Sequence, residues 1–228
     1  MDLTPEHMRL IVLSMIVLIA SIAVHEFGHA FVADRLGDDL PRRQGRVTLN
    51  PVAHADLIGT IFLPLIGMVY TIQSGYPAGF GWGKPVQVRP EKFSRKYTMA
   101  TGHMMVALAG PMMNILLGTL LVAVHVTLMA SHVVAPGSEP SLMLWSAQML
   151  NFTLFFFNLV PAPPLDGGWV MARFIPYKYR PAYERYMTYG PFVVMALVMI
   201  SPLRKVFTVP AQFVSELLYR GFGALAGM

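Results

Sequence analysis

Residues 8–36 read MRLIVLSMIVLIASIAVHEFGHAFVADRL, an apolar run that carries His25, Glu26 and His29 in its second half. The run is long enough to cross a bilayer as a helix. Histidines four residues apart lie one above the other on a helix face, so both imidazoles can reach one metal ion. Glu26 would stand beside that metal, where a carboxylate can accept a proton from a metal-bound water. Because charged groups inside an apolar helix are unfavourable, we interpret these residues as functional rather than as the mark of a helix end.

The remainder of the chain also has the composition of a membrane protein. Only 13% of its 228 residues are charged, whereas soluble domains average about 25%. Charge-free runs cover residues 57–83, 97–138, 140–165 and 186–203, and each is close to or above the roughly 18–20 residues that a membrane helix needs. We therefore predict an all-α polytopic membrane protein with about five to six transmembrane helices, folded as a single integral membrane domain over residues 1–228.

Glycine and proline signals divide the chain into segments. The first helix is expected over residues 8–36, with Gly37 as its C-terminal stop. Residues 57–73 would enter the membrane, and the chain would come back as a re-entrant or extended segment near 74–90, which is rich in glycine and aromatic residues. Further helices are expected over residues 101–130, 142–160, 187–202 and, more weakly, 206–227. The catalytic core would occupy about residues 8–170, followed by C-terminal membrane segments at about 187–227.

Positive charge is concentrated on one side of the predicted spans. Thirteen of the 17 Lys and Arg residues fall in the segments 35–46, 84–96 and 173–185. By the positive-inside rule these segments are cytoplasmic, so we expect a multi-pass protein of the cell inner (plasma) membrane with its N-terminus outside. The net charge of +5 does not indicate a nucleic acid partner, because basic and aromatic residues do not interleave in one compact stretch.

A catalytic zinc site takes three protein ligands and leaves one position open, and this chain has no cysteine. Asp166 is the leading candidate for the third ligand, because it ends a charge-free run and closes the proline-rich turn NLVPAPPLDGG at 158–168. Capping of a following helix at 169–175 is the alternative role for this carboxylate. Four other residues are weaker candidates for ligands. We expect His103 and His125 to be packing or interfacial residues, and His54 and Asp56 to form a structural turn where the chain enters the membrane.

Three motifs in this order resemble the site-2 protease family of intramembrane zinc metalloproteases. They are HEFGH at 25–29, AGPMMN at 109–114 and the stretch 158–167. Two further stretches, LNP at 49–51 and GWGKPVQV at 81–88, are similar to the small bacterial branch of that family without PDZ or CBS domains. The resemblance covers about residues 20–170.

The resemblance implies His25, His29 and Asp166 as ligands of a Zn²⁺ cofactor and Glu26 as the catalytic base. We therefore predict a zinc-dependent intramembrane endopeptidase that hydrolyses a peptide bond within or near a transmembrane segment of another membrane protein, as in regulated intramembrane proteolysis. The active site would lie near the cytoplasmic side. The partners would be the transmembrane substrate and the lipid bilayer, with regulation from a membrane partner, an earlier cut in the substrate or mobile parts of this chain.

Two other functions fit a metal site in a membrane helix. One is a non-hydrolytic divalent-metal-binding membrane protein or transporter, and the other is a catalytically inactive membrane chaperone of the same fold. Transporters often contain repeated halves, and this sequence shows no long internal repeat.

A substrate helix must unwind locally before one of its carbonyls can reach a metal, and an extended protein edge could hold the unwound segment. Residues 80–89 are the candidate edge, because Val86 and Val88 alternate as in a strand. The alternative is a plain interfacial loop anchored by Trp82. The predicted substrate contacts here are Trp82, Lys84, Pro85 and Val86. Two amides within apolar helices, Asn114 and Asn158, are candidates either for substrate binding or for satisfying carbonyls freed by Pro111 and Pro161.

Overall fold

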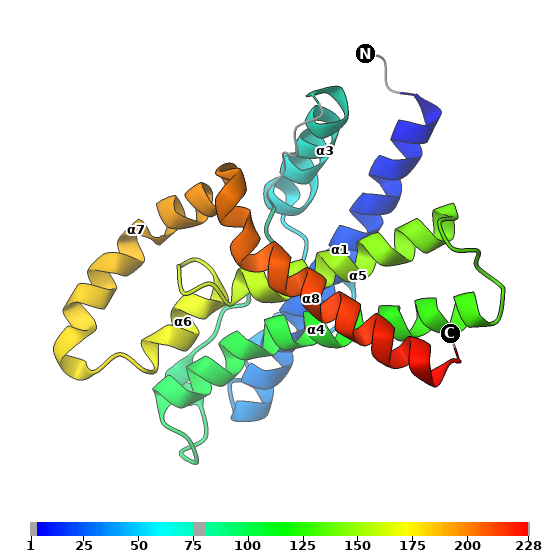
Figure 1. The fold of residues 1–228 in the computed structure, drawn as a ribbon. Coiled ribbons are helices and arrows are strands. Elements are labelled where there is room, and N and C mark those ends of the chain that lie inside the picture. Colours follow the sequence, from blue (N-terminus) through cyan, green and yellow to red (C-terminus); the bar gives the residue numbers. More distant parts are fainter. Residues whose placement is uncertain (1–3, 75–80, 228) are drawn as a thin grey trace.

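The computed structural model describes residues 4–74 and 81–227, and each regular element in these ranges is a helix (Figure 1). The α-helices are α1 (Pro5–Leu36), α2 (Leu40–Arg43), α3 (Leu63–Ser74), α4 (Met99–Ala130), α5 (Glu139–Asn158), α6 (Asp166–Ala172), α7 (Arg180–Met199) and α8 (Ser201–Leu225). A π-helical turn, Leu57–Phe62, leads into α3. Short 3-10 turns lie at Pro51–Ala53, Pro90–Lys92 and Tyr177–Tyr179. The predicted all-α fold class is confirmed.

Three of the described helices are long and apolar enough to cross a membrane: Pro5–Leu36, Leu57–Ser74 and Met99–Ala130. Tyr177–Met199 and Ser201–Leu225 pass the same test together, with a bend of 82° between them, and add a fourth span if they count as one. The sequence indicated five to six transmembrane helices, which is more than the three or four that the described residues provide. The helix α5, which we expected as a span over 142–160, buries the amides of Gln148 and Asn151 and is not among these spans.

The ends of the first helix follow from local sequence. Thr4 is the N-cap, and its hydroxyl accepts a hydrogen bond from the backbone N–H of His7. Gly37 ends the helix in the left-handed region with φ +112°, which a residue without Cβ adopts freely. The predicted stop at Gly37 is therefore confirmed, while the helix begins three residues earlier than the predicted residue 8.

Small residues let α1 and α4 pack down to their backbones. A Cβ added to Gly28 would lie 2.6 Å from the carbonyl oxygen of Ala109 in α4. Farther along α4, Gly118 faces the ring of Phe152 in α5, where an added Cβ would lie 2.5 Å away. Close approach at small residues is the usual way in which helices associate inside a bilayer. Helix α8 then crosses α4 and α5 (Figure 1) and completes a cluster of Val122, Phe152 and Ala211.

Residues 81–89, called the returning segment below, follow an irregular path between α3 and the 3-10 turn at Pro90–Lys92. Trp82 donates its backbone N–H to the carbonyl of Gly59 (3.0 Å), and Lys84 donates to the carbonyl of His54 (2.8 Å). The segment therefore lies against the turn that precedes α3. It has neither helix nor strand assignment, although Val86 and Val88 are half-buried and Gln87 between them is exposed. The rest of the predicted returning stretch, 75–80, lies outside the described residues.

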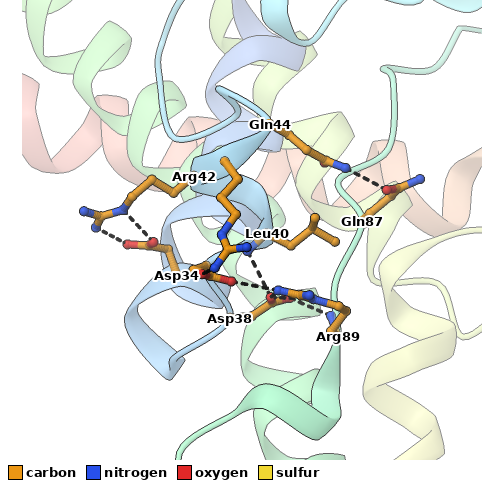
Figure 2. Close-up of polar contacts among 9 residues, drawn as sticks. Asp34, Asp38, Leu40, Arg42, Gln44, Gln87 and Arg89 are labelled. Carbon is orange, nitrogen blue, oxygen red and sulfur yellow. Dashed lines mark hydrogen bonds and ion pairs between the residues drawn. The ribbon is translucent and has the colours of Figure 1, made fainter.

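An ionic cluster fixes the end of this segment to the turn after α1 (Figure 2). The fully buried carboxylate of Asp38 accepts hydrogen bonds from the backbone N–H (2.6 Å), Nε (3.0 Å) and Nη2 (2.9 Å) of Arg89. These bonds raise the pKa of the Arg89 guanidinium. Gln44 also donates to the side-chain oxygen of Gln87 (2.8 Å). The segment is thus held to the turns that follow α1 and α2 by charge-assisted hydrogen bonds and by one neutral hydrogen bond.

Arg46 makes a second tie to the same segment. Its buried guanidinium donates to the carbonyl oxygens of Ala53 and Lys84, and burial lowers the pKa of this guanidinium. His54 is fully buried with a ring nitrogen 2.8 Å from the carbonyl of Thr48. The carboxylate of Asp56 accepts the backbone N–H groups that begin the π-helical turn. This geometry confirms the structural turn expected at His54 and Asp56.

Replacing the buried carboxylate should loosen this anchor. In Asp38→Asn an amide N–H₂ meets the Arg89 donors, so the variant should lose about 2–3 kcal/mol of unfolding free energy, as expected for charge-assisted bonds at a buried site. The matched control is Glu139→Gln, because Glu139 pairs with Arg9 while both side chains are 64% exposed. Exposed pairs contribute about 0–1 kcal/mol. Equal midpoints for the two variants in denaturant unfolding in detergent would contradict a structural role for Asp38.

Candidate metal centre

Helix α1 and the first residue of α6 bring three candidate ligand residues together. The Nε2 atoms of His25 and His29 lie 3.0 Å apart. The Asp166 carboxylate approaches both imidazoles, with Oδ2 3.2 Å from His25 Nε2 and Oδ1 3.4 Å from His29 Nε2. All three residues offer ligand atoms within 4.8 Å of one another and are buried or half-buried. The sequence candidates for the metal site therefore converge in space.

The spacing of these atoms fits a tetrahedral metal. Two ligands about 2.0–2.2 Å from a zinc ion at the tetrahedral angle are about 3.3–3.6 Å apart, and the observed separations of 3.0, 3.2 and 3.4 Å lie within about 0.3 Å of that range. Oδ2 of Asp166 is buried without a hydrogen-bond partner, as a metal-ligand oxygen would be. Two imidazoles and one carboxylate with a fourth position left for water are the donor set of a catalytic zinc site.

Contacts from α4 orient both imidazoles. His25 Nδ1 lies 2.6 Å from the side-chain oxygen of Asn114, and His29 Nδ1 lies 2.7 Å from the carbonyl oxygen of Val106. An acceptor at Nδ1 places the ring proton there and leaves the lone pair of Nε2 free for a metal. The Asn114 amide nitrogen donates to Asn151 (2.9 Å) and to the carbonyl of Ser21 (3.2 Å), which orients its oxygen toward His25.

Gly110 in α4 lies directly against the two imidazoles. A Cβ added there would be 2.3 Å from His29 Nε2 and 2.7 Å from His25 Nε2. Any side chain at this position would displace both ligand atoms. The site therefore requires glycine at this position of the AGPMMN stretch. Because α4 lies this close to α1, Asn114, one helical turn after Gly110, can contact His25.

Glu26 stands in the same cavity with a free carboxylate oxygen. Its side chain is largely buried, and Oε2 has no hydrogen-bond partner. Gly83 of the returning segment packs against it, since an added Cβ would lie 3.0 Å from Oε1. A carboxylate oxygen without a competing donor, next to the candidate ligands, is available to take a proton.

The site opens into a cavity of about 450 Å³, within the range of small-molecule and peptide sites. Its walls come from α1, the returning segment, α4, the end of α5 and the loop that carries Asp166. Of the predicted substrate contacts, Trp82, Pro85, Val86 and Asn158 line this cavity.

The other two predicted contacts lie elsewhere. Asn114 is fully buried and bonded to His25, Asn151 and Ser21, so its amide is engaged within the protein. The side chain of Lys84 is not part of the cavity wall, and the carbonyl of this residue is bound by Arg46. Neither position could be foreseen, because both depend on segments distant in sequence.

The remaining sequence candidates are also placed. Asp166 is the first residue of α6, the N-cap is Leu165, and no side-chain cap bond is present, so the alternative capping role is not observed and the helix starts before 169. His125 contacts Tyr219 and Ser141 away from the site, which confirms a packing role. His103 lines the cavity and stacks on Trp169 with ring centroids 4.6 Å apart.

Removing the Asn114 amide should weaken metal binding. In Asn114→Ala the His25 ring loses the acceptor that holds it, and loss of such a partner lowers metal affinity about 10- to 100-fold. Zinc affinity is measured by chelator competition on purified protein. The control is Gln148→Ala, which removes another fully buried amide that contacts Ser215 and Tyr219 instead. If both variants bound zinc as the parent does, Asn114 would have no part in orienting His25.

Known proteins are similar in sequence to this chain over most of its length. The model of peptidase family M50 matches residues 13–135 and 127–201. YwhC of Bacillus subtilis, whose name assigns it provisionally as a zinc metalloprotease, is 35% identical over 196 residues, covering 83% of this chain and 80% of YwhC.

Two more distant relatives are longer than this chain. Rip2 of Mycolicibacterium smegmatis, also provisionally named as a zinc metalloprotease, is 26% identical, with 80% of this chain and 64% of Rip2 covered. The zinc metalloprotease MJ0392 of Methanocaldococcus jannaschii is 23% identical, with 72% of this chain and 34% of MJ0392 covered. No solved structure gives a significant match. The family match, over the segments that carry His25, His29 and Asp166, together with the 35% identity to YwhC, places this chain in peptidase family M50, the site-2 protease family of metalloproteases.

Proposed function

We propose that this metalloprotease is a zinc-dependent intramembrane endopeptidase that cleaves a peptide bond within or near a transmembrane segment of another membrane protein. The observation that carries the proposal is the unpaired Oε2 of Glu26 beside three converging candidate ligands, two of them on the apolar helix α1 and the third at the start of α6. The family membership supports peptide hydrolysis, and the names of the relatives support zinc.

The depth of the ligands supports cleavage inside the bilayer. His29 is seven residues before the end of α1 at Leu36, which corresponds to about 10 Å along the helix axis. His25 is one turn deeper. A hydrocarbon core is about 30 Å thick, so a site at this depth would meet the end of a substrate span rather than a soluble loop.

The arrangement of charge supports a cytoplasmic position for the site. The basic segments meet at one end of the helices, where Ser94 donates to the carbonyl of Leu36 (2.7 Å) and Arg173 donates to Thr101 (3.0 Å). The positive-inside rule assigns this end to the cytoplasm and the opposite end, with the N-terminus, to the outside.

The residues of the site have separate roles in peptide hydrolysis. Zn²⁺ bound by His25, His29 and Asp166 would supply a Lewis acid and lower the pKa of a bound water to about 7. Glu26 accepts the proton of the attacking water and returns it to the leaving amine. Asn114 and the Val106 carbonyl hold the imidazoles in the required orientation throughout.

The returning segment is suited to hold an unwound substrate. Pro85 and Val86 line the cavity next to Trp82, and Asp38 and Arg46 fix this segment to α1 and its following turn. A fixed backbone edge can pair with an extended peptide by hydrogen bonds that do not depend on sequence. We assign these three side chains, with Asn158 on the facing wall, to substrate contact.

Glu26→Gln tests the proposed catalytic base. The amide keeps the shape of the side chain but accepts no proton, so cleavage should fall about 10²- to 10⁴-fold while one zinc per chain is retained. The assay incubates purified enzyme in detergent with a single-span membrane protein reporter that carries helix-breaking residues in its cytoplasmic half. The exposed Glu216 of α8 supplies the control, Glu216→Gln, which should cleave as the parent does. Equal cleavage by both variants would remove Glu26 from the mechanism.

A further inference from the structure

Helix α7 contacts residues 161–168 at two points. This stretch, the Asp166 loop, consists of the turn 161–165 and the first three residues of α6. The hydroxyl of Tyr183 donates to the carbonyl oxygen of Gly168, two residues after Asp166. The hydroxyl of Tyr186 donates to the carbonyl oxygen of Pro161 (2.7 Å), at the start of the same loop. The two tyrosines lie three residues apart, so they share one face of α7.

Packing continues along that face of α7. Gly190 lies against Pro163, and an added Cβ would be 2.3 Å from the Pro163 carbonyl oxygen. Beyond it, Val194 is buried with Ala162 and Leu165. The loop from Pro161 to Gly168 is therefore bordered by α7 over most of its length.

The remainder of α7 is poorly covered. Phe192 and Met199 are 63% and 74% exposed, and among the described helices α7 packs chiefly on α8, its neighbour in the chain. In Figure 1, α7 stands to one side of the α1, α4 and α5 group. The contacts given above join α7 to the catalytic half of the molecule through residues 161–168.

Asp166 depends on such support more than the two histidines do. His25 and His29 belong to one continuous helix, and α4 contacts both rings. Asp166 begins a helix of seven residues after an irregular loop, and its Oδ2 has no hydrogen-bond donor. Its position relative to Nε2 of the histidines therefore follows the backbone of the loop.

We propose that Tyr183 and Tyr186 are positioning residues that hold Asp166 at ligand distance from His25 and His29. This inference rests on the proposed zinc site. The two hydroxyls anchor the loop on both sides of the ligand, so that loss of either lets the carboxylate move away from the imidazoles. Helix α7 thereby becomes part of the metal centre without contacting the metal.

The test compares Tyr183→Phe, Tyr186→Phe and the double variant with Tyr189→Phe. Tyr189 lies on the same helix and is 59% exposed, which makes it a matched control for removal of a hydroxyl. A single neutral hydrogen bond is worth a factor of about 3 to 10. Each single variant should weaken zinc binding about 3-fold and the double variant about 10-fold or more, while the control binds zinc as the parent does.

Two further measurements separate positioning from folding. Zinc affinity is measured on the full chain in detergent by chelator competition, alongside the unfolding midpoint of the zinc-free protein and kcat and KM at saturating zinc. Positioning predicts weaker zinc affinity and lower kcat with KM little changed. A lower midpoint for the double variant, with zinc affinity and kcat equal to the parent, would overturn the proposal and leave a purely structural role.

The His25→Ala variant distinguishes this inference from the proposed function. Loss of zinc by His25→Ala together with unchanged affinity in the double tyrosine variant would refute positioning while the zinc site stands. Retention of one tightly bound zinc by His25→Ala would instead refute the ligand set itself, and the positioning role with it.

Discussion

The absence of a side chain at residue 110 is the constraint on which the site depends. Helix α4 passes so close to α1 that one added carbon would lie 2.3 Å from His29 Nε2. The same closeness puts the Asn114 amide and the Val106 carbonyl within hydrogen-bond reach of the two imidazoles. Lipid chains cover apolar side chains as well as another helix does, so the hydrophobic effect does not hold helices together inside a bilayer. Close packing of helix backbones takes its place. The packing that joins these two helices therefore also orients the metal ligands.

The cavity has one wall fixed by charge and another fixed by contact with a peripheral helix. The returning segment is anchored by a buried carboxylate and a buried guanidinium, Asp38 and Arg46. On the facing side, the loop from Pro161 to Gly168 rests on α7, which is itself largely exposed. The proposed cleavage of an unwound segment requires a rigid edge that aligns the substrate, and the anchored returning segment is suited to that role.

The candidate ligands and base could be predicted from sequence because the physics that marks them is local. A spacing of four residues on a helix places His25 and His29 on one face, and the scarcity of charge in apolar runs makes Glu26 and Asp166 conspicuous. The role of Asn114 could not be foreseen in the same way. From sequence, its amide could bind substrate, donate to a carbonyl freed by proline, or orient a candidate metal ligand. Only the position of α1 against α4 shows that it contacts His25. Lys84 was likewise predicted to contact substrate because it lies within the stretch 80–89, but its side chain is not part of the cavity wall.

Sequence alone determined an all-helical membrane chain, the stop of its first helix at Gly37, and the candidate metal ligands and base. These properties follow from composition, helix periodicity and the conformational freedom of one glycine, all of which act over a few neighbouring residues. Tertiary structure alone decided which carbonyl orients His29, that Glu26 keeps an unpaired oxygen, and that the loop of Asp166 rests on Tyr183 and Tyr186. Those facts depend on how closely helices distant in sequence approach one another, and that distance is set by packing in three dimensions.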